Sequence, residues 1–292
     1  MGNRLYIKRE FSLNFNNLTM TGMVLGDESK VPILCLHGWL DNAASFEIIA
    51  PKIKDRHLIA LDFIGHGQSS HRALNHPYYI WDNVTDLYSA LEALKIDKID
   101  ILGHSMGASV AVLFAACFPE KVSRLYLIEG LAPLNYAADK LPLLMAKAIR
   151  KRVAAKSSPS RSHIDLNTFI NARSNSFFPV SLTAAEMLVK RGTQADLNGY
   201  RWSSDPALLL PSINRMGIGQ IEAFLQAIKV PVVLYIAEQG LVDDQWREYF
   251  KYVEQLKVHT FCGNHHLHMQ EEGANLIAQS LSECFAKCGP IK

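Results

Sequence analysis

The sequence predicts an α/β fold built on a mostly parallel sheet of eight strands, flanked by helices and interrupted by a helical insertion. Three observations predict it: short apolar runs that end in glycine or a polar residue, helical stretches between them, and a long segment in which this alternation stops. Strands that alternate with helices imply a doubly wound sheet. The chain has 292 residues, 49 % of them hydrophobic, and can bury a core of that size.

Six apolar runs are the predicted inner strands, because parallel strands that are covered on both faces have continuous apolar sequences. They are 31–38, 57–65, 99–105, 125–130, 232–240 and 258–265. Two intervening segments have apolar residues at helical spacing, 80–94 and 106–118. We expect these two helices to cover the sheet.

The alternation stops between 131 and 211, where the sequence becomes helical and rich in loops without a convincing strand. We therefore expect a core made of 1–130 and 212–292 and a helical cap over 131–211, inserted after the sixth core strand. Within the cap, 140–161 carries only basic charges. A solvated helix face would explain them; attraction to an acidic substrate or an anionic membrane surface is the alternative.

Composition argues against several classes of protein. Thirty basic residues against 28 acidic ones are far from the bias of a nucleic-acid-binding protein. No apolar run approaches the roughly 20 residues that span a bilayer, and the first residues have no apolar secretory core. The five cysteines are odd in number and form no CxxC framework, which favours a reducing compartment. We expect a cytoplasmic protein without stable membrane insertion.

The strongest motif is Gly103-His104-Ser105-Met106-Gly107, which follows an apolar run and precedes an apolar helix. A sharp strand-to-helix turn strains its middle residue and brings neighbouring chain close, so glycine is needed two residues to either side. The following helix directs N–H groups toward the raised hydroxyl. We predict that Ser105 is a nucleophile. A serine that merely caps a helix is the bland alternative.

A second predicted element stabilises negative charge beside that hydroxyl. Leu36-His37-Gly38-Trp39 ends the first strongly buried strand, where a backbone N–H could face an oxyanion. We assign the predicted oxyanion hole to the backbone N–H groups of Trp39 and Met106.

The general base is predicted among three late histidines, because the expected chain order is serine, acid, histidine. His265 directly follows a strand in a Gly-x-His sequence and is ranked first; His268 is expected to line the site and His266 to be exposed. A metal site is not expected from this cluster, because no E-x-x-H sequence or carboxylate helix accompanies it.

The orienting acid has two possible positions. The usual one, after the run 232–240, has Gly240 where an aspartate commonly stands. Glu129 instead ends the run 125–130, and a lone carboxylate there is costly to bury without a partner such as His265. We predict Glu129 as the acid. Asp243 or Asp244, a Ser-His dyad supported by water, and a purely structural Glu129 are the alternatives.

These residues resemble the α/β-hydrolase superfamily along almost the whole chain, and more narrowly its serine hydrolase-like (kraken-type) group. The matching stretches are 36–46, 62–69, 103–107, 127–133, 201–206 and 263–268. The resemblance implies the α/β-hydrolase fold and hydrolysis of an ester or a related acyl bond. An acid on the sixth strand is similar to many haloalkane dehalogenases, but those have aspartate in place of Ser105, and a serine ether would be a dead end. The turn 62–69 is predicted to be structural.

We expect a carboxylesterase-like serine hydrolase that acts on a small or medium apolar ester through an acyl-enzyme, without metal or organic cofactor. A thioesterase or C–C bond hydrolase would use the same triad, and a non-catalytic ligand-binding protein is a further alternative. The candidates for the substrate pocket are His37, His104, Trp202 and His268. The apolar cap residues that could enclose a substrate are Leu143, Leu144, Phe169, Phe177, Phe178 and Trp202.

Overall fold

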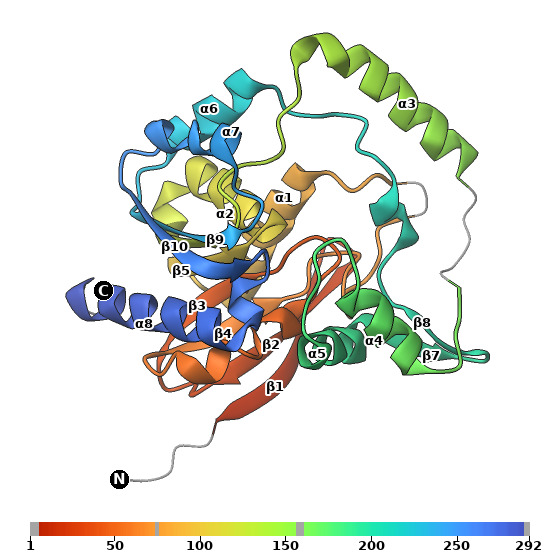
Figure 1. Ribbon diagram of the computed structural model, residues 1–292, viewed down its shortest axis with the longest axis horizontal. Helices are drawn as coiled ribbons and strands as arrows, with labels where there is room; N and C mark the ends of the chain where they lie inside the picture. Colours follow the sequence, from red (N-terminus) through yellow and green to blue (C-terminus); the bar gives the residue numbers. More distant parts are fainter. Residues whose placement is uncertain (1–5, 74–75, 156–160, 289–292) are drawn as a thin grey trace.

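One eight-stranded sheet forms the centre of the computed structural model, which describes residues 6–73, 76–155 and 161–288 (Figure 1). Its strand order is β1-β2-β4-β3-β5-β6-β9-β10. The strands are β1 (Ile7–Phe15), β2 (Leu18–Gly26), β3 (Val31–Leu36), β4 (Arg56–Leu61), β5 (Ile99–His104), β6 (Val122–Ile128), β9 (Val232–Gln239) and β10 (Leu256–Asn264). Six strands of this sheet, β3, β4, β5, β6, β9 and β10, are mutually parallel, and β1 and β2 add an antiparallel hairpin. The predicted fold class is confirmed.

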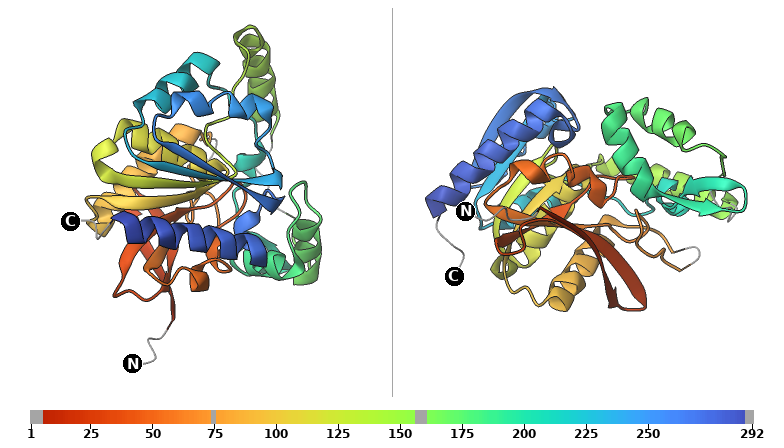
Figure 2. Two further views of the ribbon diagram at one scale, coloured as in Figure 1. Left: turned by 60° about the vertical axis from the view of Figure 1, so that its left-hand side comes forward. Right: turned by 90° about the horizontal axis from the view of Figure 1, so that it is seen from below.

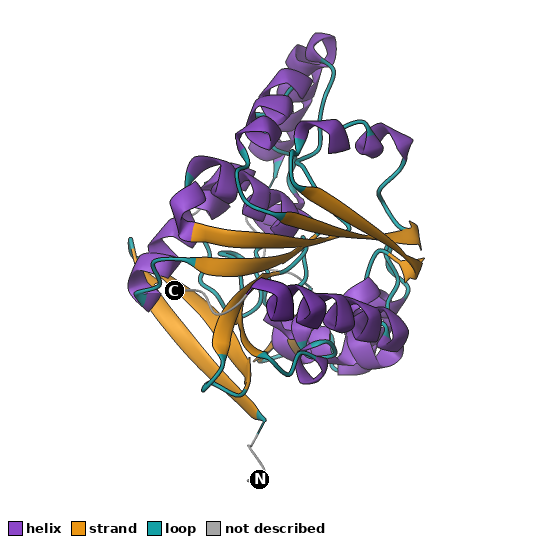
Figure 3. Ribbon diagram, turned by 90° about the vertical axis from the view of Figure 1, so that its left-hand side faces the viewer, coloured by secondary structure: helices purple, strands orange, loops and turns teal. Residues whose placement is uncertain are grey.

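Successive residues of the inner strands point to opposite faces of this sheet. Leu34 and Leu36 of β3 belong to a hydrophobic cluster with the helices of one face, whereas Ile33 and Cys35 belong to a second cluster on the other face. Because both faces are covered, these strands are apolar along their whole length. Figure 3 shows helices on both sides of the strands.

The first face is covered by α1 (Ile80–Leu94), α2 (Met106–Cys117) and α6 (Ile218–Ala227), and the second by α8 (Glu271–Cys288). A short helix, α7 (Asp244–Arg247), follows β9. The predicted helix over 80–94 has the bounds of α1, because its apolar residues face the sheet and Lys95 ends it in a left-handed conformation. None of the helices within the described ranges is long and apolar enough to cross a membrane.

The cap segment, as we term residues 131–211, contains α3 (Leu141–Ala154), α4 (Leu166–Ser174), α5 (Leu182–Gly192), β7 (Thr193–Asp196) and β8 (Gly199–Trp202). Figure 1 shows α3 standing away from α4 and α5. The right-hand view of Figure 2 separates the green α4–α5 group from the blue α8. Exposed side chains of Lys147, Arg150 and Lys151 on α3 agree with a solvated basic face.

One expectation for the cap segment was wrong, because β7 and β8 form an antiparallel hairpin there. Each strand has only four residues, too few to give a clear alternating pattern. The turn sequence Asn198-Gly199, with Gly199 at a φ of 120°, was the available signal.

Candidate active site

Ser105 lies on the turn between β5 and α2, with φ 52° and ψ −113°. A Cβ on Gly107 would lie 2.1 Å from the carbonyl oxygen of Leu36, so only glycine lets the turn approach β3 this closely. The backbone N–H of Ser105 donates to the carbonyl of Ile128 at 2.9 Å, which fastens the turn to β6. The Ser105 side chain makes no capping hydrogen bond to α2. The geometry therefore fits a raised, strained serine better than a helix cap.

His265 follows β10 and places its Nδ1 atom 3.2 Å from Oε2 of Glu129. Both side chains are buried, His265 with 4 % exposure and Glu129 with 1 %. In the described ranges no hydrogen bond joins Ser105 Oγ to His265; in substrate-free sites such contacts are often long. The structure therefore brings a carboxylate to the ring nitrogen that an orienting acid would hold.

The Glu129 carboxylate is held in place by the backbone of the neighbouring strand end. Its Oε1 accepts from the N–H of Ala237 and its Oε2 from the N–H of Leu241, both at 2.6 Å. A Cβ on Gly240 would lie 2.1 Å from Oε2. The carboxylate of Glu129, which follows β6, therefore lies beside position 240, where an aspartate was the usual expectation.

The two alternative carboxylates lie elsewhere. Asp243 accepts from the N–H of Trp246 and caps α7, and the side chain of Asp244 is fully exposed. Within the described ranges neither makes a hydrogen bond or ion pair with His265.

The two predicted oxyanion donors come from adjoining segments of chain. Met106 is the first residue of α2, and Trp39 lies in the loop that follows β3. That loop contains a tight turn in which the N–H of Asp41 donates to the carbonyl of Gly38 at 3.1 Å. The close approach of Gly107 to the carbonyls of Leu36 and His37 places this loop beside the start of α2.

Comparison with known proteins identifies the family. The family profile described as alpha/beta hydrolase fold matches residues 31–272, more than half of the chain. The chain belongs to the α/β-hydrolase fold family. Serine hydrolase-like protein 2 of Homo sapiens is 31 % identical over 273 residues, which cover 87 % of each protein. Relatives with this description place the chain in the serine hydrolase-like group of α/β hydrolases.

Solved structures of other proteins share this architecture. The crystal structure of a hypothetical protein from Pseudomonas aeruginosa PAO1 superposes with a TM-score of 0.90 at 35 % identity, covering 96 % of this chain and 100 % of that one. A thioesterase domain from the curacin biosynthetic pathway has a TM-score of 0.83 at 22 % identity, covering 94 % of this chain and 99 % of that domain, and shows the shared fold.

Three of the four pocket candidates of this α/β hydrolase are fully buried beneath the site. His37 accepts from the N–H of Phe63 at 3.0 Å, and its other ring nitrogen lies 2.7 Å from the carbonyl of Gly38. The Nε2 atom of His104 lies 2.9 Å from the carbonyl of His265. Burial lowers the pKa of both rings, so they are neutral supports for the loops around Ser105.

The third buried candidate, His268, joins this group, and Trp202 lies apart from it. His268 packs its ring 4.3 Å from that of His104, and burial lowers its pKa to about 3. Trp202 ends β8 and meets Phe169 edge to face at 5.0 Å, within the cap segment.

Among the apolar cap residues, Phe178 contacts His265, the predicted base. Its ring centroid lies 4.4 Å from that of His265. Phe177 is 89 % exposed beside it, and Leu143 on α3 is also exposed. Phe178 therefore covers the predicted base on the cap side.

His266 was expected to be exposed, and this expectation was wrong. It is 3 % exposed because its Nε2 atom lies 3.2 Å from Asp41 and 2.9 Å from the Arg173 guanidinium. Asp41 and Arg173 were not predicted at all. Asp41 lies in the matched stretch 36–46, which was a signal; the position of Arg173 in α4 carried none.

Asp41, His104 and His266 bring three possible metal ligands within 4.8 Å of one another. The Arg173 guanidinium already bonds Asp41 and His266, so its positive charge stands where that of an ion would lie. This arrangement does not suit a metal ion unless the guanidinium leaves.

The turn 62–69 has the structural contacts expected of it. Asp62 accepts from the N–H groups of Ala43 at 2.7 Å and Gln68 at 2.9 Å, and pairs with Arg191 of α5 at 2.8 Å. Burial would raise the pKa of the Asp62 carboxyl, but Arg191 outweighs burial and lowers it. The ionised carboxylate therefore joins the cap segment to the core.

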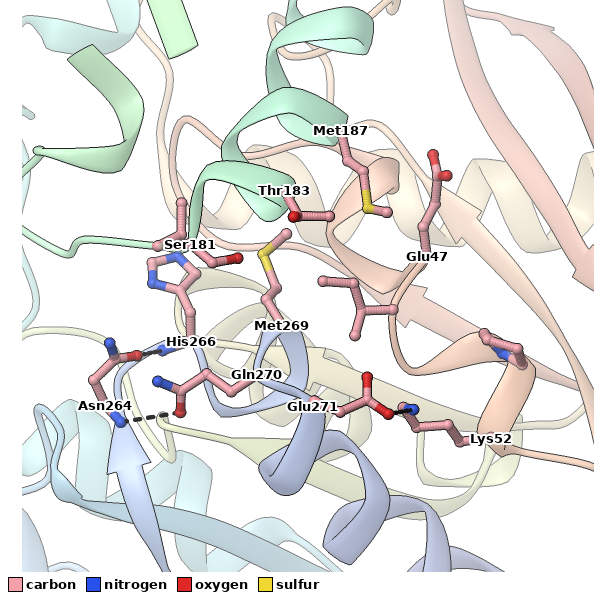
Figure 4. A pocket seen from close by; sticks show the side chains of 13 residues that line it. Glu47, Lys52, Ser181, Thr183, Met187, Asn264, His266, Met269, Gln270 and Glu271 are labelled. Carbon is pink, nitrogen blue, oxygen red and sulfur yellow. Dashed lines mark hydrogen bonds and ion pairs between the residues drawn. The ribbon is translucent and has the colours of Figure 1, made fainter. Parts of the chain in front are cut away.

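A cavity of about 640 Å³ borders the segment that follows β10 (Figure 4). Figure 4 shows Asn264 and His266 on one wall, Met187 of α5 opposite, and the Lys52–Glu271 ion pair at one end. Ser105 is not among the lining residues. The cavity therefore borders the base loop without containing the reacting hydroxyl.

Proposed function

We propose that this α/β hydrolase cleaves a carboxylic ester by nucleophilic catalysis at Ser105. The observation that carries the proposal is the buried His265–Glu129 contact of 3.2 Å at the sheet edge where Ser105 stands on its strained turn. A general base oriented by a carboxylate, together with a half-buried serine hydroxyl at the carboxyl ends of the same parallel strands, is the set of groups that acyl transfer uses.

In the acylation step, His265 takes the proton of Ser105 Oγ while the oxygen attacks the ester carbonyl. The Trp39 and Met106 N–H groups stabilise the oxyanion, and Glu129 stabilises the imidazolium. When the intermediate collapses, His265 returns the proton to the alkoxide, and the alcohol leaves.

In the deacylation step, His265 takes a proton from water, and the resulting hydroxide attacks the acyl-enzyme carbonyl. Collapse of the second oxyanion breaks the bond to Ser105 Oγ, which recovers its proton from His265. The carboxylic acid is released, and no metal or organic cofactor takes part.

An apolar substrate is supported by exposed apolar side chains in the loops that follow three of the parallel strands, β3, β6 and β9. Trp39 after β3, Leu134 after β6 and Leu241 after β9 expose 52 %, 65 % and 38 % of their surfaces. Exposed apolar side chains that gather around a site commonly mark the surface that receives an apolar ligand.

The test is hydrolysis of p-nitrophenyl esters from acetate to decanoate by wild type, Ser105→Ala and the matched control Ser109→Ala. Ser109 lies four residues further along, within α2, where its hydroxyl donates to the carbonyl of Ala132 at 2.8 Å and is buried. We expect turnover by wild type and Ser109→Ala and none by Ser105→Ala, with a chain-length optimum that reports the size of the pocket.

Labelling by a fluorophosphonate, mapped by mass spectrometry, separates the other outcomes. If Ser105 is labelled but no ester is turned over, the proposed substrate becomes a thioester or a compound with a cleavable C–C bond. Folded wild-type protein that does not label would overturn catalysis and favour a ligand-binding role.

We also propose a cytosolic location. Cys35, Cys117 and Cys262 are free thiols, as a reducing compartment would allow. Fractionation of cells that express the protein checks this; recovery from an oxidising compartment would contradict it.

A further inference from the structure

The guanidinium of Arg173 lies where three segments of the candidate active site meet. Its Nη2 donates to Oδ1 of Asp41 at 2.8 Å and lies 2.9 Å from Nε2 of His266. Its Nη1 donates to the carbonyl of Phe178 and to Oγ of Ser176, each at 2.9 Å. Arg173 belongs to α4 in the cap segment, whereas Asp41 and His266 belong to the core.

Each of these contacts reaches a group that the proposed chemistry uses. Asp41 closes the turn 38–41, which contains Trp39, one of the two proposed oxyanion donors. His266 is the neighbour of His265. Phe178 packs its ring against the His265 ring at 4.4 Å. The Arg173 side chain therefore contacts the Trp39 loop (38–42), the His265 loop (262–268) and Phe178, which covers the His265 ring.

We propose that Arg173 is a positioning residue that holds the Trp39 loop, the His265 loop and Phe178 in the arrangement that acylation of Ser105 requires. The inference rests on the proposed function, and it assigns the cap segment a part in assembling the site.

The charges of this cluster fit such a fixed arrangement. Burial would raise the pKa of the Asp41 carboxyl, but His266 and Arg173 outweigh burial and hold that pKa well below its usual range. Burial lowers the pKa of His266, and the Arg173 cation lowers it further against the opposing effect of Asp41. The Arg173–Asp41 ion pair at 2.8 Å is therefore a charge-assisted contact of fixed direction beside the His266 ring.

One side of the loop 262–268 borders a cavity. Asn264 and His266 line the cavity of about 640 Å³ that Figure 4 shows, so fewer atoms oppose a shift of the loop in that direction. The contacts of His266 Nε2 with Arg173 and Asp41 restrain the ring against this shift.

A second arginine provides a matched control. Arg191 of α5 also joins the cap segment to the core, through Asp62 at 2.8 Å and Glu10 at 2.6 Å, and it is 5 % exposed. Within the described ranges, the hydrogen bonds of its guanidinium go to Asp62 and Glu10 and reach neither 262–268 nor Phe178. Loss of Arg191 should weaken the attachment of the cap without touching the catalytic loops.

The experiment compares Arg173→Gln, Arg173→Lys and Arg191→Gln by the rate of fluorophosphonate labelling at Ser105, by kcat and KM on the best ester, and by thermal unfolding. We expect Arg173→Gln to lower labelling and kcat about 10-fold to 100-fold with a smaller change in KM, because small displacements of reacting groups cost rates of this size. Arg173→Lys should recover part of the loss. Arg191→Gln should lower Tm and leave the labelling rate of the folded protein unchanged.

Two further measurements keep the proposal testable. If Arg173→Gln does not fold because Asp41 is left unpaired, Arg173→Gln with Asp41→Asn removes both buried charges and should still label slowly. Hydrogen exchange in 38–42 and 262–268 should become faster in the Arg173 variants and not in Arg191→Gln, whether or not the wild type proves to be an esterase. Wild-type labelling and wild-type exchange in a folded Arg173→Gln would overturn the proposal; a wild type that does not label would overturn the proposed function instead.

Discussion

The carboxylate of Glu129 occupies the space that a side chain on Gly240 would need. A Cβ at position 240 would lie 2.1 Å from Oε2 and 2.3 Å from Oε1 of Glu129. Position 240, where an aspartate commonly stands, must therefore be glycine if the Glu129 carboxylate at the end of β6 is to lie there.

We therefore predict that Gly240→Ala lowers kcat/KM about 100-fold, because the methyl group displaces the carboxylate from Nδ1 of His265. The measurement is steady-state hydrolysis of the best ester. Gly217→Ala is the control, since nothing lies within 4 Å of a Cβ there.

The double variant Gly240→Ala with Glu129→Gln tests the cause. It should be no slower than Glu129→Gln alone, because the methyl group acts only through the carboxylate. Additive losses would mean that Gly240 affects catalysis by another route.

Glu129→Gln should reduce acylation by orders of magnitude, about 10³-fold, while the protein still folds. The amide has no charge to stabilise the imidazolium, and only one of its two ends can accept from the N–H groups of Ala237 and Leu241. Pre-steady-state release of p-nitrophenol measures the step.

The matched variants are Asp243→Asn and Asp244→Asn. Asp244 is exposed, and Asp243 caps α7, so we expect ester hydrolysis close to wild type in both, with at most about 1 kcal/mol of stability lost in Asp243→Asn. A larger rate loss in either one than in Glu129→Gln would reverse the assignment of the acid.

Glycine usually makes a folded protein less stable than alanine does at the same position, and we expect position 105 to be an exception. Ser105 has φ 52° and ψ −113°, a conformation that costs a residue with a Cβ about 1 to 3 kcal/mol. We predict that Ser105→Gly has a free energy of unfolding at least as high as Ser105→Ala, although both are inactive.

The same pair of substitutions at Ser109, within α2, should show the usual order, with alanine more stable than glycine. Ser109→Gly should be about 1 kcal/mol less stable than Ser109→Ala, because position 109 lies within α2. Denaturant unfolding of the four variants decides the matter; Ser105→Gly less stable than Ser105→Ala by the same amount would show that the turn stores no such strain.

Acid should destabilise the folded protein before its carboxylates titrate. Burial lowers the pKa of six histidines, and in two of them, His66 and His268, to about 3; the other four are His37, His104, His259 and His266. Unfolded histidines titrate near 6.5, so the unfolded state binds more protons below that pH. Their contribution to stability is complete above pH 6.5 and is lost as the pH falls toward 3.

Burial also raises the pKa of two carboxyls, that of Asp86 to about 6 and that of Asp100, which acts in the opposite direction but involves two groups against six. The free energy of unfolding, measured from pH 8 to pH 5, should therefore fall below pH 6.5. His268→Leu should reduce the slope by about 1.4 kcal/mol per pH unit, and the exposed His76→Gln should not. A free energy that is constant over this range would contradict the prediction.

Local features were predictable from the sequence because they depend on neighbouring residues. The inner strands, α1 and the Ser105 turn each follow from a run of apolar residues or from glycines at fixed spacing. The hairpin of β7 and β8 was missed because four residues are too few to show a period.

The partners of each charged group were decided by the tertiary structure. Sequence reasoning left Glu129, Asp243 and Asp244 open, because all three follow apolar strands; only the packing of β6 beside β9 brings Glu129 to a histidine 136 residues away. Arg173 had no local signal, since its contacts join residues 132 and 93 positions distant in the chain. The sequence by itself determined the fold class and the strained serine through short-range periodicity and sterics, whereas the contacts of the acid and the placement of Arg173 depend on how distant segments pack, which no short pattern encodes.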